Sequence, residues 1–291
     1  MPIKIIAFVV LFTVASLPAT KAAQMSALSF SLTYLDRFKI KDDEAGLTEP
    51  SGLALSREGD ALWTVSDDTK SIFKLSLEGE LLNDQAFKIG DEGLEGVTVD
   101  PATGDLLVIK EEAYEILKID PTSEETVSRH LLSDMAGFES VQQHLSDDVD
   151  NDGLEGITFN QDTESFFLLK EREPGLIIEI SKDLGSILSV HVLNAANGFA
   201  DDNVDADEID FSGIQYDPTR SSFWIVSDRA KRLFLYDLER GQVIQSAALG
   251  YEKDGEFREI KKAEGVAVDA QHNRLYVVSD AEARLYVFDL R

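Results

Sequence analysis

One pattern recurs five times along this chain of 291 residues: a glycine, a short alternating segment, a polar turn, a second apolar run and an acidic residue fifteen positions after the glycine. The glycines are Gly52, Gly96, Gly156, Gly213 and Gly265. The acids are Asp67, Glu111, Glu171, Asp228 and Asp280. Two alternating runs joined by a turn-rich segment are typical of a β-hairpin. Hairpins spaced by roughly 50 residues indicate a repeat architecture, and four-stranded propeller blades have about that period.

The repeat count and the chain ends predict an all-β fold, a five-bladed β-propeller with four strands in each blade. The last repeat stops at its third strand, residues 285–289, so its blade lacks a fourth strand. Residues 31–40 alternate like a strand, and their end, Phe38-Lys39-Ile40, recurs in Phe87-Lys88-Ile89, which closes the first full repeat. We therefore expect the N-terminal strand to close the last blade and remove an open sheet edge. Six blades are the alternative if a linker contains weak strands.

The N-terminus has the features of a secretory signal, which predicts a signal peptide over residues 1–22 and a single propeller domain over 23–291. Lys4 precedes an apolar run of about 13 residues, and small residues follow it near Ala22. That run is shorter than the roughly 20 residues that span a bilayer as a helix. We expect a periplasmic or secreted protein with no transmembrane segment after signal removal. The alternative is an uncleaved signal that tethers the chain to the inner membrane.

The charge balance restricts the partners. Without residues 1–22 the chain carries 25 basic residues against 55 acidic ones, a net charge of −30. Nucleic acids and anionic membranes require cationic patches, so neither is an expected partner. The chain has no cysteine, which excludes disulfides and thiolate metal sites, whereas the many carboxylates suit hard cations.

Propeller geometry gathers the repeated acids. The residue before each glycine enters the first strand, and the acid fifteen positions on ends the second, so both lie at the same end of the ring. The first position is glutamate in three repeats, Glu95, Glu155 and Glu264. Crowded carboxylates raise one another's pKa unless a cation compensates them. Two kinds of cation are expected to compensate these carboxylates, a bound metal ion or neighbouring basic residues. The basic residues that are possible anion contacts are Lys110, Lys170 and Arg229.

A calcium-like segment precedes the third repeat. Asp148, Asp150 and Asp152 alternate and are followed by Gly153, as in the first half of an EF-hand loop. The twelfth position is Phe159, where an EF-hand has a bidentate glutamate, so Glu155 or the acids of other blades, Glu95 and Glu264, are expected to complete the shell. A solvated acidic linker is the alternative. A less regular candidate lies in the second long linker: Asp202, Asp205, Asp207 and Glu208.

Nucleophilic catalysis has little support in the sequence. None of the four histidines lies beside a serine and an acid in a triad-like context, and no glycine-rich phosphate loop occurs. The repeated pairs Ser66-Asp67, Ser227-Asp228 and Ser279-Asp280 indicate turn hydrogen bonds, since a single active site does not need a residue in every blade. Phe159 and Tyr216 are expected to pack between blades.

Three segments resemble the YjiK/CarP family, also called SdiA-regulated proteins: DGLEGITFNQDTESFFLLKEREPG, DFSGIQYDPTRSSFWIVSDRA and KAEGVAVDAQHNRLYVVSDAEARLYVF. The resemblance extends from about residue 31 to the end. It implies an exported bacterial β-propeller, associated in part with calcium, whose molecular activity is poorly defined. A looser likeness links the chain to propeller phosphoesterases of the phytase type and to lactonases, whose full ligand sets are not recognisable here.

These observations predict an exported, calcium-binding propeller that acts as a binding or interaction module through its acidic face, with an unidentified ligand or protein as partner. The alternative is a calcium-dependent hydrolase of phosphate esters or lactones. In that case Glu95, Glu155 and Glu264 hold the ion, and Lys110, Lys170 or Arg229 binds the anionic substrate.

Overall fold

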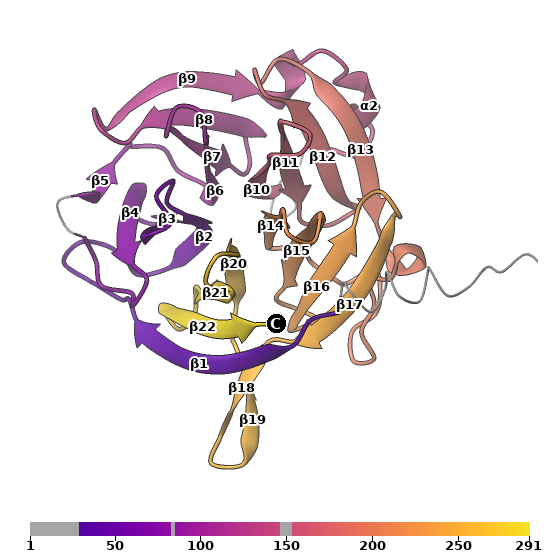
Figure 1. Cartoon of the computed structure of the whole chain (residues 1–291). Helices are drawn as coiled ribbons and strands as arrows, with labels where there is room; N and C mark the ends of the chain where they lie inside the picture. The colour runs from indigo at the N-terminus through magenta and orange to yellow at the C-terminus, as the bar shows by residue number, and fades with distance from the viewer. Residues whose placement is uncertain (1–28, 83–84, 146–152) are drawn as a thin grey trace, which may run out of the picture.

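The computed structural model of the chain describes residues 29–82, 85–145 and 153–291. They form five four-stranded antiparallel sheets arranged as the blades of a β-propeller, viewed along the ring axis in Figure 1. The inner strands β2, β6, β10, β14 and β20 contact one another in that order, and β20 returns to β2. The prediction of five four-stranded blades is therefore confirmed.

Blades one to four each use four consecutive strands. Blade one consists of β2 (Pro50–Leu55), β3 (Ala61–Ser66), β4 (Ser71–Ser76) and β5 (Phe87–Lys88). Blade two consists of β6 (Leu94–Val99), β7 (Leu106–Lys110), β8 (Glu115–Asp120) and β9 (Glu125–Leu131). Blade three consists of β10 (Leu154–Asn160), β11 (Ser165–Lys170), β12 (Gly175–Ser181) and β13 (Ile187–Leu193). Blade four consists of β14 (Gly213–Asp217), β15 (Ser222–Ser227), β16 (Arg232–Asp237) and β17 (Gln242–Ala248).

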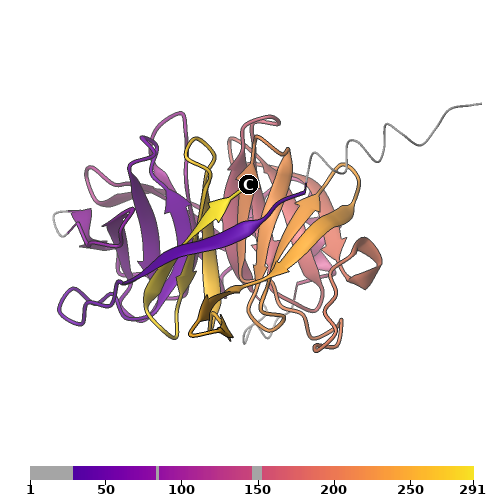
Figure 2. The ribbon, with the colours of Figure 1, turned by 60° about the horizontal axis from the view of Figure 1, so that its bottom comes forward.

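Blade five joins the two ends of the chain. Its strands β20 (Ala263–Asp269), β21 (Arg274–Ser279) and β22 (Arg284–Leu290) are completed on the outside by β1 (Leu32–Lys39). β1 pairs antiparallel with β22 from Leu32 opposite Leu290 to Lys39 opposite Arg284, and Figure 2 shows β1 crossing in front of blade five. The predicted closure by the N-terminal strand is confirmed.

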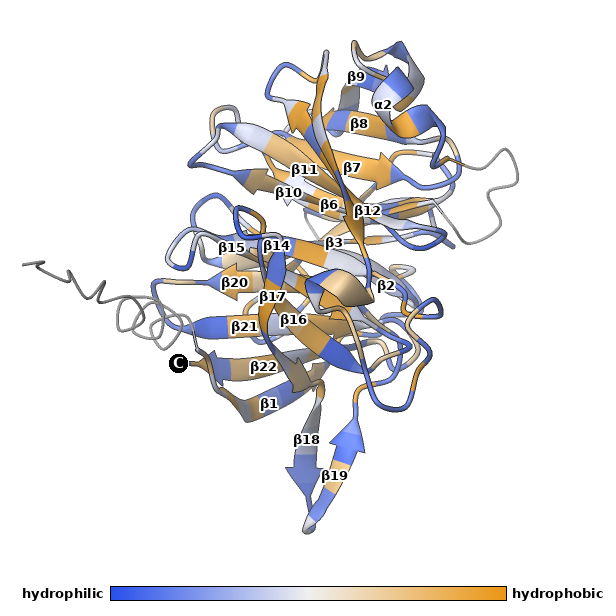
Figure 3. Ribbon diagram, turned by 90° about the vertical axis from the view of Figure 1, so that its right-hand side faces the viewer, coloured by the Kyte–Doolittle hydropathy of each residue, from blue (hydrophilic) through white to orange (hydrophobic). Residues whose placement is uncertain are grey.

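Five clusters of buried side chains fill the spaces between neighbouring blades. The second strand of most blades is buried along its whole length because it packs against a blade on each side. Phe167 of blade three and Phe223 of blade four, for example, lie with their rings 4.8 Å apart. Figure 3 shows the hydrophobic residues in the strand centres and the hydrophilic ones in the turns. The core is therefore divided among the blade interfaces.

The fourth residue after each repeat glycine caps the first hairpin turn. These residues are Ser56, Asp100, Asn160, Asp217 and Asp269, and all are buried. The Asp100 and Asp217 carboxylates, for example, each accept a hydrogen bond of 2.9 Å from a backbone N–H two residues on. Side-chain oxygens in this position mimic a backbone turn, which explains the polar residue at the end of each alternating segment.

The linkers contain short elements that the repeat pattern does not encode. The first linker contains the 3₁₀ turn η2 (Leu132–Asp134) and the short helix α2 (Glu139–Gln142), and η3 (Ala195–Asn197) opens the second linker. A hairpin of β18 (Gly250–Lys253) and β19 (Glu256–Glu259) projects from the ring (Figure 1) and was not predicted. Among the described residues, no helix is long and apolar enough to span a bilayer. The predicted signal peptide, residues 1–22, lies outside the described residues and stays a prediction.

Candidate functional site

An acidic cavity of about 230 Å³ opens at one mouth of the central channel, and all five blades contribute to its wall. The residues before the repeat glycines line it: Ser51, Glu95, Glu155, Ser212 and Glu264. So do the acids that end the second strands: Asp67, Glu111, Glu171, Asp228 and Asp280. The structure thus brings together the eight acids that the repeat pattern places at one end of the ring.

The repeat glycines form the floor of this acidic cavity. Below it only about 10 Å³ of space remains between the inner strands. A β-carbon on Gly96 would lie 2.7 Å from the Cα of Gly156, and one on Gly265 would lie 2.8 Å from the carbonyl carbon of Gly52. Real β-carbons do not approach backbone atoms this closely, so the five inner strands can converge only because each carries glycine at this level. The cavity is therefore blind.

β-Bulges position the glutamates. Leu154 pairs with Lys170 and Gly156 with Leu169, so Glu155 is the extra residue between them. The pairing shifts in the same way around Glu264, and around Glu95 in blade two. A bulge re-aims the side chain of the extra residue and bends the strand. In these blades it lets the residue before the glycine face the cavity.

Burial and mutual repulsion raise the pKa values of the glutamates. The pKa of Glu155 lies well above its usual range, because burial and the carboxylates of Glu95 and Glu111 disfavour its charged form. The pKa of Glu95 is raised in the same way, chiefly by burial and by the carboxylates of Glu111 and Glu264. Burial raises the pKa of Glu264 to about 8, with Lys262 opposing the shift. The charged forms of these groups are therefore unfavourable unless a cation compensates them.

Two basic residues line the acidic cavity among the described residues, Arg229 and Lys262. The Lys262 ammonium pairs with the Asp280 carboxylate. Arg229 is exposed at the rim, and its backbone N–H donates to Asp210 Oδ1 at 2.9 Å. Of the described residues that line the cavity, those of blades two and three are all acidic, and just outside the lining Arg172 Nε pairs with Glu171 Oε2 at 3.4 Å.

The other predicted anion contacts lie elsewhere. Lys110 Nζ lies 3.4 Å from Asp91 Oδ1 and is not among the described residues that line the acidic cavity. Lys170 is fully buried, and its ammonium donates to the carbonyl oxygen of Arg172. Arg229 is therefore the predicted contact that reaches the cavity.

The two predicted calcium segments have different outcomes. Asp148, Asp150 and Asp152 lie outside the described residues. Asp202, Asp205, Asp207 and Glu208 are exposed and are not among the residues that line the cavity. The end of the second linker does reach it, however, through the buried Asp210, which accepts a hydrogen bond of 2.6 Å from Ser227 Oγ.

The prediction missed three lining residues, Glu49, Asp210 and Lys262. All three lie three positions before a repeat glycine, and the other two repeats have Gly93 and Gly153 there. Gly93 N–H donates to the Asp67 carboxylate. Burial raises the pKa of Glu111, and a hydrogen bond from the backbone N–H of Gly153 opposes that shift. This position therefore either extends the wall or holds the acid of the preceding blade, and aligning the repeats three residues further back would have revealed it.

The donor chemistry of the acidic cavity fits a hard cation. Carboxylates and the Ser51 and Ser212 hydroxyls supply oxygen only, which suits Ca²⁺ or Mg²⁺ rather than zinc or copper. Among the described residues, the buried Oε1 of Glu111 has no hydrogen-bond partner. Within residues 29–82, 85–145 and 153–291, however, no three acids or histidines are placed to hold a metal ion as they stand. Binding would require rotation of glutamate side chains.

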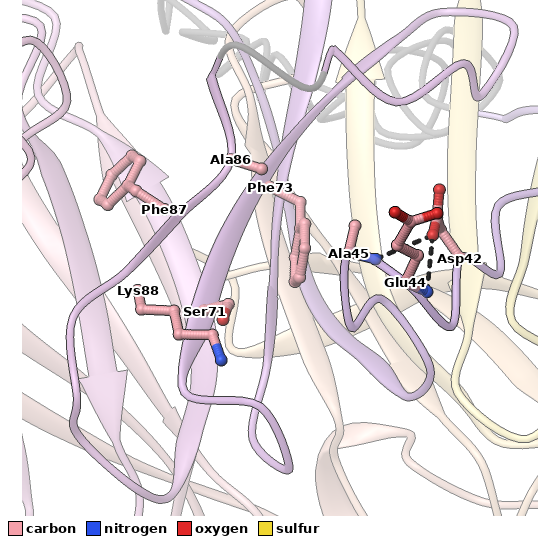
Figure 4. Close-up of a pocket in the computed structure, with 8 residues that line it drawn as sticks. All are labelled: Asp42, Glu44, Ala45, Ser71, Phe73, Ala86, Phe87 and Lys88. Carbon is pink, nitrogen blue, oxygen red and sulfur yellow. Dashed lines mark hydrogen bonds between the residues drawn. The ribbon is translucent and has the colours of Figure 1, made fainter.

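A larger hollow of about 460 Å³ lies on the outer side of blade one, between Phe73 and the 42–45 turn (Figure 4). Its carboxylate Asp42 turns back to accept hydrogen bonds from the backbone N–H groups of Glu44 and Ala45, at 3.0 and 2.9 Å. This hollow brings together few groups of one kind, whereas the acidic cavity gathers one or more from every blade. The acidic cavity is therefore the candidate site.

Solved structures with a similar fold are propeller proteins. A glutaminyl cyclase from Myxococcus xanthus matches with a TM-score of 0.58 and 11% identity, over 89% of this chain and 96% of that one. A streptogramin B lyase matches with a TM-score of 0.45 and 13% identity, over 83% of this chain and 65% of the lyase. At 11% identity the likeness to the cyclase shows the fold alone, and no conclusion is drawn from the match to the lyase. The SdiA-regulated family model matches residues 32–289, which include all five blades, and the chain therefore belongs to the SdiA-regulated family.

Proposed function

We propose that this protein is an exported binding module whose acidic cavity takes a calcium ion and, with it, a ligand or protein partner at the same face. One observation carries the proposal: Glu95, Glu155 and Glu264 line a blind cavity in which burial and neighbouring carboxylates raise their pKa values. A site built in this way is destabilised by its own charge at neutral pH and is stabilised by a bound cation.

The excess of negative charge in the acidic cavity favours a cation. Among the described residues, ten acids and two basic residues line it, and one of the basic residues, Lys262, is already paired with Asp280. A divalent ion near the glutamates would favour their charged forms, as metal ions generally do for their ligands. Calcium is favoured over magnesium because it accepts six to eight oxygens in irregular geometry, whereas magnesium requires a near-ideal octahedron.

The glutamates suit such an ion because their backbones are held while their side chains can turn. The bulges and the glycine floor hold the backbone at Glu155 and Glu264. Each side chain still has three rotatable bonds, so the carboxylates can approach a common ion without a change in the strands. Arg229, exposed at the rim, provides a contact for an anionic group on the partner.

Calorimetric titration with Ca²⁺ tests the proposal. We expect wild type to bind and the triple variant Glu95→Gln, Glu155→Gln, Glu264→Gln to lose binding by at least about tenfold. The exposed Glu125→Gln on β9 is the matched control and should bind like wild type. A separate Asp150→Ala, Asp152→Ala variant tests the predicted calcium segment. Unchanged binding in the folded triple variant would show that the glutamates are not ligands.

A calcium-dependent hydrolase of phosphate esters or lactones is the second candidate, favoured by the basic residues of the acidic cavity. Arg229 and Lys262 line it together with Glu95, Glu155 and Glu264, so they are placed to bind an anionic substrate beside an ion held by these glutamates. A panel of phosphate esters and lactones, assayed with calcium and with chelator, separates the two. Turnover that is lost in Glu264→Gln would establish that the protein is a hydrolase. Calcium binding without turnover of any substrate in the panel would support the binding module instead.

A further inference from the structure

A second cavity lies at the opposite mouth of the channel, on the far side of the glycine floor. It has a volume of about 350 Å³, and residues from all five blades line it. Two of its residues, Phe159 and Tyr216, were expected to pack between blades, and each contacts a ring of its own blade, Phe166 and Phe223 respectively. Their position at the channel mouth adds a surface that packing alone does not explain.

The repeat builds this cavity from two rings. The third residue after each glycine forms an apolar collar: Leu55, Val99, Phe159, Tyr216 and Val268. The fifth residue forms the rim: Arg57, Pro101, Gln161, Pro218 and Ala270. Leu55, Val99 and Phe159 remain partly exposed. An apolar wall facing water in a concave site is a general feature of small-molecule sites.

Water has few partners in the collar. The buried polar residues between collar and rim already cap their own turns, as Asp269 does when its Oδ1 accepts from Gln271 N–H at 3.0 Å and its Oδ2 pairs with His272 Nδ1 at 2.6 Å. Ser56 Oγ likewise accepts from Ala61 N–H at 3.1 Å. A ligand that displaces water from this wall therefore loses few hydrogen bonds and removes apolar surface from water.

The polar groups of the rim are mainly uncharged. Gln161, Gln215 and Gln271 supply side-chain amides from three different blades, and Gln215 donates to the carbonyl oxygen of Tyr216 at 2.9 Å. Arg57 and Glu58 are adjacent and exposed, so the positive charge of one offsets the negative charge of the other. On a chain with a net charge of −28, this mouth does not concentrate charge of either sign, in contrast to the acidic cavity.

We propose that this second mouth binds an uncharged small amphiphile, with an apolar body in the collar and carbonyl or hydroxyl groups hydrogen-bonded to the glutamine rim. The volume lies within the range of about 300–1,000 Å³ typical of small-molecule sites. An anionic amphiphile is disfavoured by the overall negative field. Because the glycine floor separates the two cavities, this site binds independently of the acidic one.

Fluorescence titration with the neutral probe N-phenyl-1-naphthylamine tests this site. Wild type should bind one molecule per chain saturably. Val99→Glu places a carboxylate in the collar and should weaken binding by at least about tenfold, since burying a charge beside an apolar ligand is costly. Val127→Glu is the matched control: Val127 is 58% exposed on the outer strand β9, away from the mouth, and the variant should bind like wild type.

A second variant keeps the test informative if Val99→Glu does not fold. Gln161 is exposed at the rim, so Gln161→Trp should leave the melting temperature unchanged while it narrows the mouth and weakens probe binding. The anionic probe 8-anilinonaphthalene-1-sulfonate should bind more weakly than the neutral one. Equal weakening by Val127→Glu, or unchanged binding in both folded mouth variants, would overturn the site. Tighter binding of the anionic probe would overturn the ligand class.

Discussion

The side chain of Glu111 in blade two packs directly on the backbone of Gly153 in blade three. A β-carbon at position 153 would lie 2.9 Å from the Glu111 carbonyl oxygen and closer still to its Cγ. Gly153 directly follows Asp152, the last acid of the predicted calcium segment. Its carbonyl oxygen accepts a hydrogen bond of 3.0 Å from Glu171 N–H. One glycine thus contacts the acids of two blades at the wall of the acidic cavity.

Replacement of Gly153 should therefore disturb the cavity. We expect Gly153→Ala to displace Glu111, to lower the unfolding free energy by about 1–3 kcal/mol and to weaken calcium binding. The control is Gly185→Ala, because a β-carbon there would meet its nearest atom, Asp183 Oδ1, at 3.4 Å. Chemical denaturation and calorimetry check both effects, and equal behaviour of the two variants would contradict the proposed contact.

Neutralising Glu264 should stabilise the metal-free protein. Burial raises the pKa of Glu264 to about 8, so at pH 8.5 the folded protein holds an unfavourable buried charge there. In chelator at this pH, Glu264→Gln removes that charge, and the unfolding free energy should rise by on the order of 1 kcal/mol. In calcium the same variant should be less stabilised than wild type. Glu125→Gln, exposed on the outer strand of blade two, should change neither value. A destabilised Glu264→Gln in chelator would show that repulsion does not dominate at this position.

Stability should fall with rising pH in the absence of metal. The pKa of Glu264 is raised to about 8 from 4.5, so the folded state binds more protons than the unfolded state between these values and loses stability as pH rises through them. Groups such as Asp91, whose pKa is lowered chiefly by Arg129, act in the opposite direction and lose their contribution only below about pH 4. Melting temperatures in chelator should decline from pH 5 to 8.5, and added calcium should raise them most at the upper end. A flat profile would exclude uncompensated glutamates.

Closure of the ring should depend on Phe30, just before β1. Its ring contacts Trp224 of blade four edge-on at 4.7 Å, and its backbone exchanges hydrogen bonds of 3.0 and 2.8 Å with the Gln245 side chain. Phe30→Ala should cost about 3–5 kcal/mol of unfolding free energy. Leu35→Ala, on β1 but 45% exposed, should cost less than about 0.5 kcal/mol. Denaturant titrations compare them, and similar losses would indicate that the strand acts through pairing alone.

Several features escaped the repeat pattern for identifiable reasons. The hairpin β18–β19 buries little beyond Gly250 and Tyr251, so it carries no apolar alternation to find. The bulges at Glu155 and Glu264 depend on how two strands pair, which no single strand encodes. Lys170 looked like a rim cation beside Glu171, yet its side chain turns inward to a backbone carbonyl.

The repeat pattern alone predicted the number of blades, the closure by the N-terminal strand and the end of the ring where the acids gather. It did so because alternation and repeat spacing are local properties that each copy states again. The arrangement of the strands in space was needed to show that five glycines close the channel and that bulges point the glutamates toward a blind cavity. The same arrangement forms the second mouth, with its apolar collar and polar rim. These features arise where strands far apart in the chain converge on one axis, and their distances are set by packing between blades.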